Sequence, residues 1–300
     1  MQESKIVVIF GATASGKTEL SVSLAQSIHA QIINMDSMQI YKRLSIGTAK
    51  PTQRQRRSVA HHLFDFLEPD EEYSVALYQK DALRAIEKVF RDGDIPLLVG
   101  GTGLYLSSLY YDYSFREKSE NEIVFSQLLQ ELGAEKIASQ LIKEGVCGLD
   151  QVDIENPHRL FRVWQTRQVH PKSERTRSNL PMMLFHLVQP REILHERIER
   201  RTKRMLEEGL IEEVQGLLET GFTGREPAMK GIGYRECIRY LQGEMSLSQL
   251  ETSIVVSTRR YAKRQLTWIR NQYPCVEELD GTMPIETLIS HISDILKESL

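Results

Sequence analysis

The chain has 300 residues, of which 41% are hydrophobic and 26% charged, and its formal net charge is −3. That composition allows one large domain or two modest ones with a buried core. No run of 18 apolar residues occurs, which excludes a membrane-spanning helix, and the polar start MQESK lacks the features of a secretory signal. The three cysteines are far apart and form neither a disulfide framework nor a zinc spacing, so we expect a cytoplasmic protein.

The first hundred residues alternate between strand and helix patterns. Residues 6–10 (IVVIF) predict a buried strand, a helix is expected over 19–29, and a second strand over 31–34. Residues 75–91 carry apolar side chains at helical spacing, and residues 95–101 (IPLLVGG) predict a third buried strand. Such alternation indicates an α/β fold whose parallel sheet is flanked by helices.

The pattern changes from about residue 114. Residues 114–181 are polar, helical in pattern and poor in strand signal, so we expect a helical insertion domain there. Residues 182–188 (MMLFHLV) predict another strand, and long charged helices are expected over 192–220 and 246–270. The predicted organisation is therefore a core built from 1–113 and 182–300, interrupted by the insertion.

Basic residues are segregated on this acidic chain. Residues 159–204 contain twelve Lys and Arg against four Asp and Glu, and residues 259–270 contain five basic residues and no acidic one. In the second stretch, RRYAKRQLTWIR, the basic residues would lie on two adjacent faces of a helix with Tyr261 and Trp268 between them. This pattern fits RNA, although it is equally typical of a solvated helix face, and Trp268 is better explained as a core residue than as a stacking platform.

The stretch GATASGKT follows the first predicted strand and precedes the first predicted helix. It has the spacing of a phosphate-binding loop, whose backbone N–H groups and lysine hold phosphate oxygens while its threonine meets Mg²⁺. The candidate diphosphate-binding residues are Gly11, Ala12, Thr13, Ala14, Ser15, Gly16, Lys17 and Thr18, with Thr18 as the Mg²⁺ ligand. The motif predicts a diphosphate and a magnesium ion without identifying the molecule that carries the phosphates.

Two further stretches lie at the same predicted sheet edge. Asp36 follows the second strand, where a carboxylate can accept a proton, bind Mg²⁺ or cap a turn. The glycines of GGTGLY expose Thr102 after the third strand, but that strand end lacks the acidic residue that an ATPase would use to hold Mg²⁺. This lack argues against ATP hydrolysis.

Taken together, the motifs resemble one family, the bacterial tRNA dimethylallyltransferases, also called tRNA isopentenyltransferases. The matching stretches, in the family's order over nearly the full chain, are GATASGKT, DSMQIYKRLSIGTAKP, HHLFD, YS, VGGTGLY, GIGYRE and RRYAKRQLTWIR. The resemblance implies transfer of a five-carbon group from dimethylallyl diphosphate to N6 of adenosine 37, beside the tRNA anticodon. By the same resemblance, the substrates would be tRNAs that read codons beginning with U.

The resemblance also implies roles for individual residues. Asp36 matches the general base, Thr102 meets the adenosine, and Lys17 and Arg201 act on the diphosphate. The residues that match tRNA-contacting positions are Asp36, Ser37, Met38, Gln39, Thr102, His158, Arg159, Arg162, Lys230, Gly231, Gly233, Tyr234, Arg235, Arg259, Arg260, Lys263, Arg264 and Gln265.

The chain departs from the family's usual pattern at three places. Ala12 stands where a proline is usual, Met38 replaces a frequent arginine, and residues 156–175 keep only an Arg-x-x-Arg pattern. Two alternatives remain open from the residues alone: a small-molecule or nucleoside kinase, and a non-catalytic RNA-binding switch that senses nucleotide. We expect a monomer.

Overall fold

The computed structural model describes residues 5–111, 113, 120–167, 176–273 and 276–298. The chain divides into two compact units, a core of residues 1–110 and 178–300 and a second unit of residues 111–177. The boundaries expected from sequence, 113/114 and 181/182, lie within four residues of this division.

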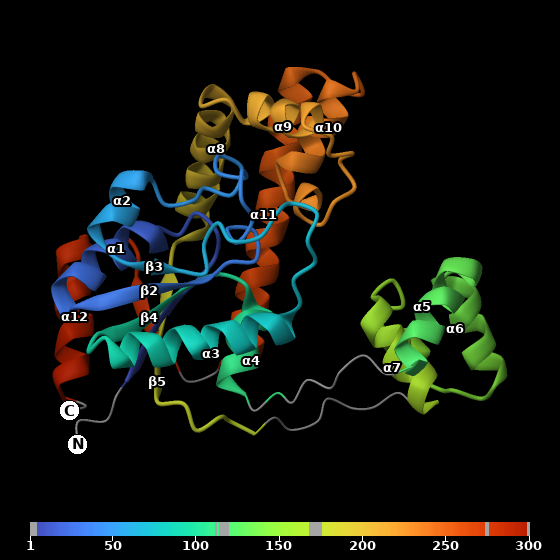
Figure 1. Ribbon diagram of the computed structural model, residues 1–300, viewed down its shortest axis with the longest axis horizontal. Coiled ribbons are helices and arrows are strands. Elements are labelled where there is room, and N and C mark those ends of the chain that lie inside the picture. The colour runs from blue at the N-terminus through green and yellow to red at the C-terminus, as the bar shows by residue number, and fades with distance from the viewer. Residues whose placement is uncertain (1–4, 112, 114–119, 168–175, 274–275, 299–300) are drawn as a thin grey trace. The chain divides into compact units, whose positions relative to one another are not determined.

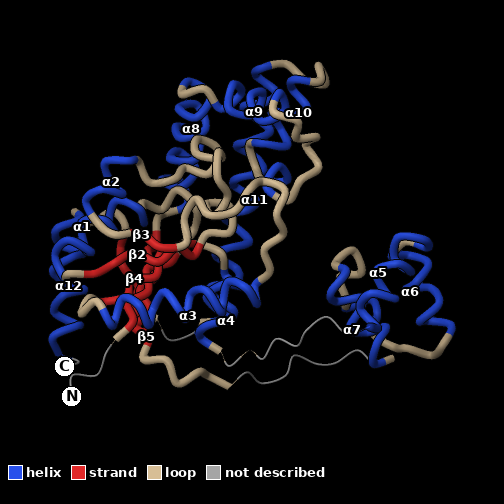
Figure 2. The backbone as a smooth tube through the Cα atoms, viewed as in Figure 1, coloured by secondary structure: helices blue, strands red, loops and turns tan. Residues whose placement is uncertain are grey.

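The core is organised around one parallel sheet of six strands (Figures 1 and 2). Its strands are β1 (Ile6–Phe10), β2 (Ala30–Met35), β3 (His61–His62), β4 (Ile95–Gly100), β5 (Met182–Val188) and β6 (Glu277–Asp280). They lie in the order β3-β2-β4-β1-β5-β6, and every pairing between neighbours is parallel. The predicted α/β fold is confirmed, and the carboxyl ends of the three expected N-terminal strands meet at one edge of the sheet.

Helices cover both faces of this sheet. The helices of the core are α1 (Lys17–Ile28), α2 (Gln53–Ser58), α3 (Val75–Arg91), α4 (Gly103–Tyr110), α8 (Arg191–Glu207), α9 (Leu210–Glu219), α10 (Tyr234–Leu241), α11 (Leu247–Gln272) and α12 (Ile285–Glu298), with a short 3₁₀ turn at Ala228–Lys230. One face buries alternate strand residues such as Val7, Ile9 and Leu97 against α1 and α12. Helix α3 contacts β2 and β4 but contributes no residue to that cluster, so it packs on the other face.

A second apolar cluster fixes α9 and α10 beside the chain that follows β2. It combines residues 38–49 with α9, α10 and the first half of α11, and includes the buried side chains of Ile40, Leu44, Val214 and Ile254. A smaller cluster packs Ala12 of the phosphate-binding loop against Leu194 and Ile198 of α8 and Val255 and Ala262 of α11. The methyl group of Ala12 is thus used for packing.

The structure differs from the sequence prediction in one long helix and several short elements. The helix expected over 192–220 is interrupted, because Gly209 adopts a φ of +99° between α8 and α9. Strands β3 and β6 and helices α2, α4, α10 and α12 were not predicted. No helix within the described ranges is long and apolar enough to cross a membrane.

The second unit is a small helical cluster, as its polar helical pattern predicts. It contains α5 (Glu120–Leu132), α6 (Ala134–Lys143), a 3₁₀ turn at Leu149–Gln151 and α7 (Pro157–Thr166). Its own core includes Phe125, Ile137, Leu141 and Leu160. Arg159 and Arg162 are exposed on α7, and the side chain of His158 lies outside the described residues.

The contact between the ends of β2 and β4 leaves no room for a side chain at Gly100. A Cβ there would lie 2.1 Å from the carbonyl oxygen of Met35, which also accepts the Thr102 N–H at 3.2 Å. We therefore expect Gly100→Ala to lower the free energy of unfolding by about 1–3 kcal/mol and to displace Thr102. Gly216→Ala is the matched control, since it adds the same methyl group to open space on α9 and should be neutral or stabilising. Urea denaturation of both variants measures the difference; equal stability of the two would contradict the close approach.

Candidate active site

The phosphate-binding loop (Gly11–Thr18) connects β1 to α1 at the carboxyl edge of the sheet. A Cβ at Gly11 would lie 2.7 Å from the carbonyl oxygen of Leu187, so a glycine is needed where the loop passes β5. Gly16 has a φ of +103° and is the N-cap of α1. The loop therefore presents its backbone and the N-terminus of α1 to an adjoining space, which suits an anion.

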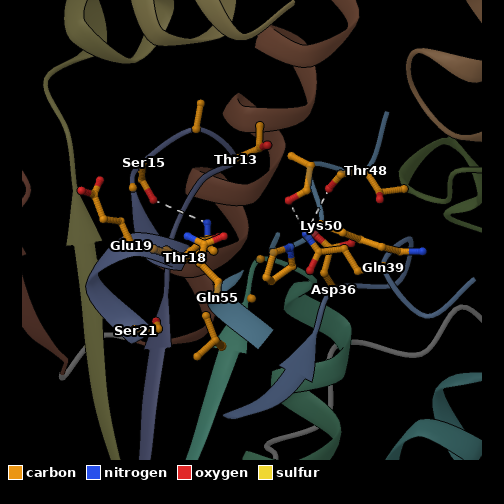
Figure 3. A pocket seen from close by; sticks show the side chains of 18 of the residues that line it. Thr13, Ser15, Thr18, Glu19, Ser21, Asp36, Gln39, Thr48, Lys50 and Gln55 are labelled. Carbon is orange, nitrogen blue, oxygen red and sulfur yellow. Dashed lines mark hydrogen bonds between the residues drawn. The ribbon is translucent and has the colours of Figure 1, made fainter. Parts of the chain in front are cut away.

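That space, here called the phosphate cavity, has a volume of about 610 Å³. Figure 3 shows Thr13, Ser15 and Thr18 on one side of it, with Asp36, Thr48 and Lys50 opposite. Its other lining residues include Ala14, Gly16, Lys17, Gln39, Gly101, Arg197, Arg200, Arg201, Arg204 and Gln265. Six of the eight predicted diphosphate-binding residues, Thr13 to Thr18, thus border one cavity with Asp36, whereas Gly11 and Ala12 do not line it.

Lys17 is partly buried at the base of this cavity. Its Nζ donates to the carbonyl oxygens of Gly11 at 3.0 Å and Ala12 at 2.7 Å. Burial lowers the pKa of the ammonium to about 8, while the nearby Asp36 carboxylate raises it and the Arg201 guanidinium lowers it further. An incoming anion would supply the negative counter-charge that favours the protonated form of this desolvated ammonium.

Two arginines of α8 donate hydrogen bonds to the phosphate-binding loop. Arg201 Nη2 donates to Thr13 Oγ1 at 2.7 Å, and Arg197 Nη1 donates to the Ser15 carbonyl oxygen at 3.0 Å. Arg201 lines the phosphate cavity as the sequence led us to expect. Arg197 was missed, although its position one helical turn before Arg201 is the signal that both point the same way.

Asp36 lies in a turn directly after β2. The buried Asn34 side chain accepts from the Asp36 N–H at 2.9 Å and donates to the Asp36 carbonyl oxygen at 3.0 Å. Asp36 Oδ1 in turn accepts from the Met38 N–H at 2.9 Å, so this carboxylate does cap a turn. Its Oδ2 has no hydrogen-bond partner in the described part of the chain and remains able to accept a proton from a substrate.

Thr102 is held against the same turn. Its Oγ1 accepts from the Ser37 N–H at 3.0 Å and lies 3.3 Å from Ser37 Oγ. Burial raises the pKa of the neighbouring Tyr261 hydroxyl, and the Asp36 charge raises it further. Tyr261 hydrogen-bonds to Thr102, so the Asp36 turn, the end of β4 and α11 converge here.

A second cavity of about 300 Å³ adjoins this turn. Among its lining residues are Ser37, Met38, Gly47, Met205, Lys230, Gly231, Gly233, Arg235, Thr258, Tyr261 and Arg264. Thr13, Asp36, Thr48, Ala49 and Arg201 line both cavities. Asp36 thus borders the phosphate cavity on one side and, on the other, the second cavity with its predicted tRNA-contacting residues.

Two residues expected to contact tRNA instead make internal contacts. Gln265 is 6% exposed; its Oε1 accepts from the Thr13 N–H and its Nε2 donates to the Gly101 carbonyl oxygen, each at 2.8 Å. Tyr234 is 0% exposed and its hydroxyl donates to Glu213 at 2.6 Å. Tyr234 has no surface left for RNA, and the Gln265 amide, although it borders the phosphate cavity, is occupied by the backbone of Thr13 and Gly101.

The basic residues of α11 that are expected to contact tRNA differ in exposure and in ion pairing. Arg260, Lys263 and Arg264 are exposed, whereas Arg259 pairs with Glu199 of α8 at 2.5 Å. Trp268 donates from Nε1 to Ser107 Oγ at 3.3 Å and packs against Gly103, as expected of a core residue. The Met38 side chain packs beside Gly231.

Thr18 is the residue predicted to bind a divalent cation here. Thr18 lines the phosphate cavity at the start of α1, and the described residues contain no group of three or more His, Cys, Asp or Glu side chains that could hold a metal. This donor set fits Mg²⁺, which keeps several waters and binds through a substrate's phosphate oxygens. It does not fit an ion that needs a protein cage.

Comparison with known proteins gives a consistent result. The IPP transferase family model matches residues 39–272, and an isopentenyl transferase model matches residues 4–64. A tRNA dimethylallyltransferase of Pelotomaculum thermopropionicum is 40% identical over 90% of this chain and 88% of its own length. One from Macrococcus caseolyticus is 36% identical over 98% of this chain and 96% of its own length.

Solved structures resemble the chain over nearly its whole length. The tRNA isopentenylpyrophosphate transferase of Staphylococcus epidermidis has a TM-score of 0.75 and 32% identity, covering 99% of this chain and 100% of that one. A eukaryotic dimethylallyltransferase acting on tRNA has a TM-score of 0.77 and 27% identity over 93% of this chain and 74% of its own. Because the family model spans most of the chain and these relatives align along both units, the protein belongs to the IPP transferase family.

Proposed function

We propose that this protein transfers the dimethylallyl group of dimethylallyl diphosphate to N6 of adenosine 37 of tRNA, with release of diphosphate. The family relationship supports a dimethylallyl transfer to tRNA. The observation that carries the assignment of roles is the position of Asp36 on the wall shared by the two cavities. A donor in the phosphate cavity and an acceptor in the second cavity would meet beside its carboxylate.

The phosphate cavity supplies what a diphosphate leaving group needs. The carbon–oxygen bond of the allylic donor breaks as negative charge develops on the diphosphate. Lys17, the N-terminus of α1 and Arg201 carry positive charge or N–H groups at the cavity and would stabilise that developing charge. Thr18 would hold Mg²⁺, which supplies further charge neutralisation on the phosphate oxygens.

Asp36 is suited to act on the acceptor. An exocyclic adenine amine is a weak nucleophile because its lone pair is delocalised into the ring. The Asp36 carboxylate can orient the amine and accept its proton through Oδ2 as the nitrogen attacks the allylic carbon. Thr102, held 3.3 Å from Ser37 Oγ, borders the same turn and can contact the base.

The tRNA-contacting surface would be larger than the second cavity. Lys230 and Arg235 line that cavity, and Arg260, Lys263 and Arg264 are exposed on α11. Contacts between these cations and phosphates would offset the few kcal/mol needed to unstack an adenosine from the anticodon loop. The substrates are proposed to be tRNAs reading codons that begin with U.

Radiolabelled donors distinguish isoprenyl transfer from the kinase alternative. With a donor labelled in its isoprenyl group, label should enter tRNA, whereas γ-labelled ATP should label no small acceptor. Mass spectrometry of digested tRNA should then show a dimethylallyl group on one adenosine, at position 37. Phosphoryl transfer from ATP without isoprenyl transfer would overturn the proposal in favour of the kinase.

Lys17 generates a prediction with a defined pH dependence. Its folded-state pKa of about 8 is below the usual 10.5, so its charge is lost as the pH rises through 8. The contribution of Lys17 to donor affinity, measured without tRNA, should be constant below pH 7 and fall by up to about tenfold per pH unit above 8. Lys17→Ala should bind the donor more weakly, and its affinity should depend less on pH. The pH dependence that remains in this variant comes from ionisation of the donor itself and serves as the correction.

Lys17→Ala should also transfer the isoprenyl group roughly 10²-fold more slowly or worse. A Lys17→Ala rate near that of the wild type would exclude the loop as the donor site.

Asp36→Asn separates the base from the turn cap. Asparagine keeps an Oδ1 acceptor for the Met38 N–H, so stability should change little, but it loses the carboxylate charge. With both substrates saturating, we expect single-turnover transfer to fall by about 10²–10⁴-fold while tRNA affinity stays within threefold. Asp70→Asn, at an exposed position, is the charge-matched control and should transfer normally. A rate within threefold of wild type for Asp36→Asn would leave Asp36 a cap alone.

A further inference from the structure

Three consecutive backbone amides converge on the carboxylate of Glu213, a residue of α9 outside all the motifs. Glu213 Oε2 accepts from the N–H groups of Ser45 and Ile46, each at 2.9 Å, and Oε1 accepts from Gly47 at 3.3 Å. Successive N–H groups that point at one anion form a concave nest, and such bonds to a charged acceptor are stronger than neutral ones. Here the anion is part of the protein, so the nest fixes the backbone of residues 45–47.

Tyr234 joins α10 to the same carboxylate. Its buried hydroxyl donates to Glu213 Oε1 at 2.6 Å, and its ring lies against Gly47, where an added Cβ would be 2.5 Å from the ring. Helix α10 and the residues just before it carry Gly233 and Arg235, which line the second cavity. Helices α9 and α10 and the segment 45–47 are therefore tied together at one point.

The residues that follow the nest form the wall between donor and acceptor spaces. Thr48 and Ala49 line both cavities, and Ala49 has a φ of +50°, a left-handed conformation that a non-glycine residue adopts only when its surroundings hold it. From the other side, Gln39 Nε2 donates to the carbonyl oxygens of Thr48 at 3.0 Å and Ala49 at 3.3 Å. Glu213 and Gln39 thus hold this segment at both ends.

We infer that Glu213 is a positioning residue for group transfer: it fixes residues 45–49 as the wall that sets the approach of the acceptor amine to the donor. This inference rests on the proposed function. Glu213 lines neither cavity, so it would act on the bound substrates only through residues 45–49. Its loss should therefore impair the alignment of bound substrates, while their binding survives.

Glu213→Gln tests the inference with little change in shape. An amide offers one acceptor oxygen, and its NH₂ group would face N–H donors, so the nest loses part of its acceptor. We expect single-turnover transfer at saturation to fall by about tenfold or more, since small misalignments of reacting groups are costly, while donor and tRNA dissociation constants stay within threefold. Glu212→Gln is the matched control, because it removes the same charge from the adjacent exposed residue and should leave the rate within twofold.

Hydrogen exchange provides a readout that does not depend on activity. The amides of Ser45, Ile46 and Gly47 should exchange about tenfold faster or more in Glu213→Gln, and at the wild-type rate in Glu212→Gln. Unchanged exchange would overturn the positioning role, and faster exchange with a transfer rate within twofold of wild type would overturn its link to catalysis. If the wild-type protein transferred no isoprenyl group, the proposed function would fail, yet the exchange data would still decide whether Glu213 holds the segment.

Tyr234→Phe is a milder second variant, for use if Glu213→Gln does not fold. It removes one hydrogen bond to Glu213 and keeps the ring against Gly47. We expect a rate decrease of about threefold, in the same direction and again without a change in either dissociation constant. A decrease that appears only in tRNA affinity would contradict the inference, because it would mean that α10 acts as a binding surface alone.

Discussion

The amide of Gln265 joins the three parts on which the site depends. It accepts the Thr13 N–H of the phosphate-binding loop and donates to the Gly101 carbonyl oxygen at the end of β4, from a buried position on α11. A carboxamide is the side chain that can accept at one atom and donate at the other across such a gap. Because both partners are backbone groups, the phosphate-binding loop, the Thr102 segment and the long basic helix share one fixed geometry, and a buried group left unpaired would be costly.

Asp36 partly offsets the positive charge of the site. Burial lowers the pKa of both Lys17 and Arg201, and the Asp36 carboxylate counteracts that effect for each of them. The two cations are therefore under-neutralised within the protein, which favours an anionic ligand such as a diphosphate. In the proposed reaction the same carboxylate would also face the acceptor amine, so one charge would act on both substrates.

Sequence patterns predicted the regular parts of this molecule well. The bounds of β1, α3 and β5 agree with those expected, because continuous apolar strands and an amphipathic helix leave strong periodic signals. The short elements gave none: β3 has two residues, and β6 has the sequence EELD, which becomes a strand only because β5 offers it an edge. Gly209 was overlooked as a helix break inside a charged helical pattern.

The motifs by themselves determined the family and predicted the chemistry of the loop, since Gly, Lys and Thr at fixed spacing after a strand are typical of a phosphate-binding loop. Only the tertiary structure decided which side chains remain available to a ligand and which are occupied by internal hydrogen bonds. Gln265 and Tyr234 fall inside matching motifs yet are buried, while Arg197 and Glu213 belong to no motif yet hold the Ser15 carbonyl and the 45–47 amides. The reason is physical: a motif records local spacing along the chain, whereas burial and long-range hydrogen bonds depend on how α8, α9 and α11 pack against loops more than a hundred residues away.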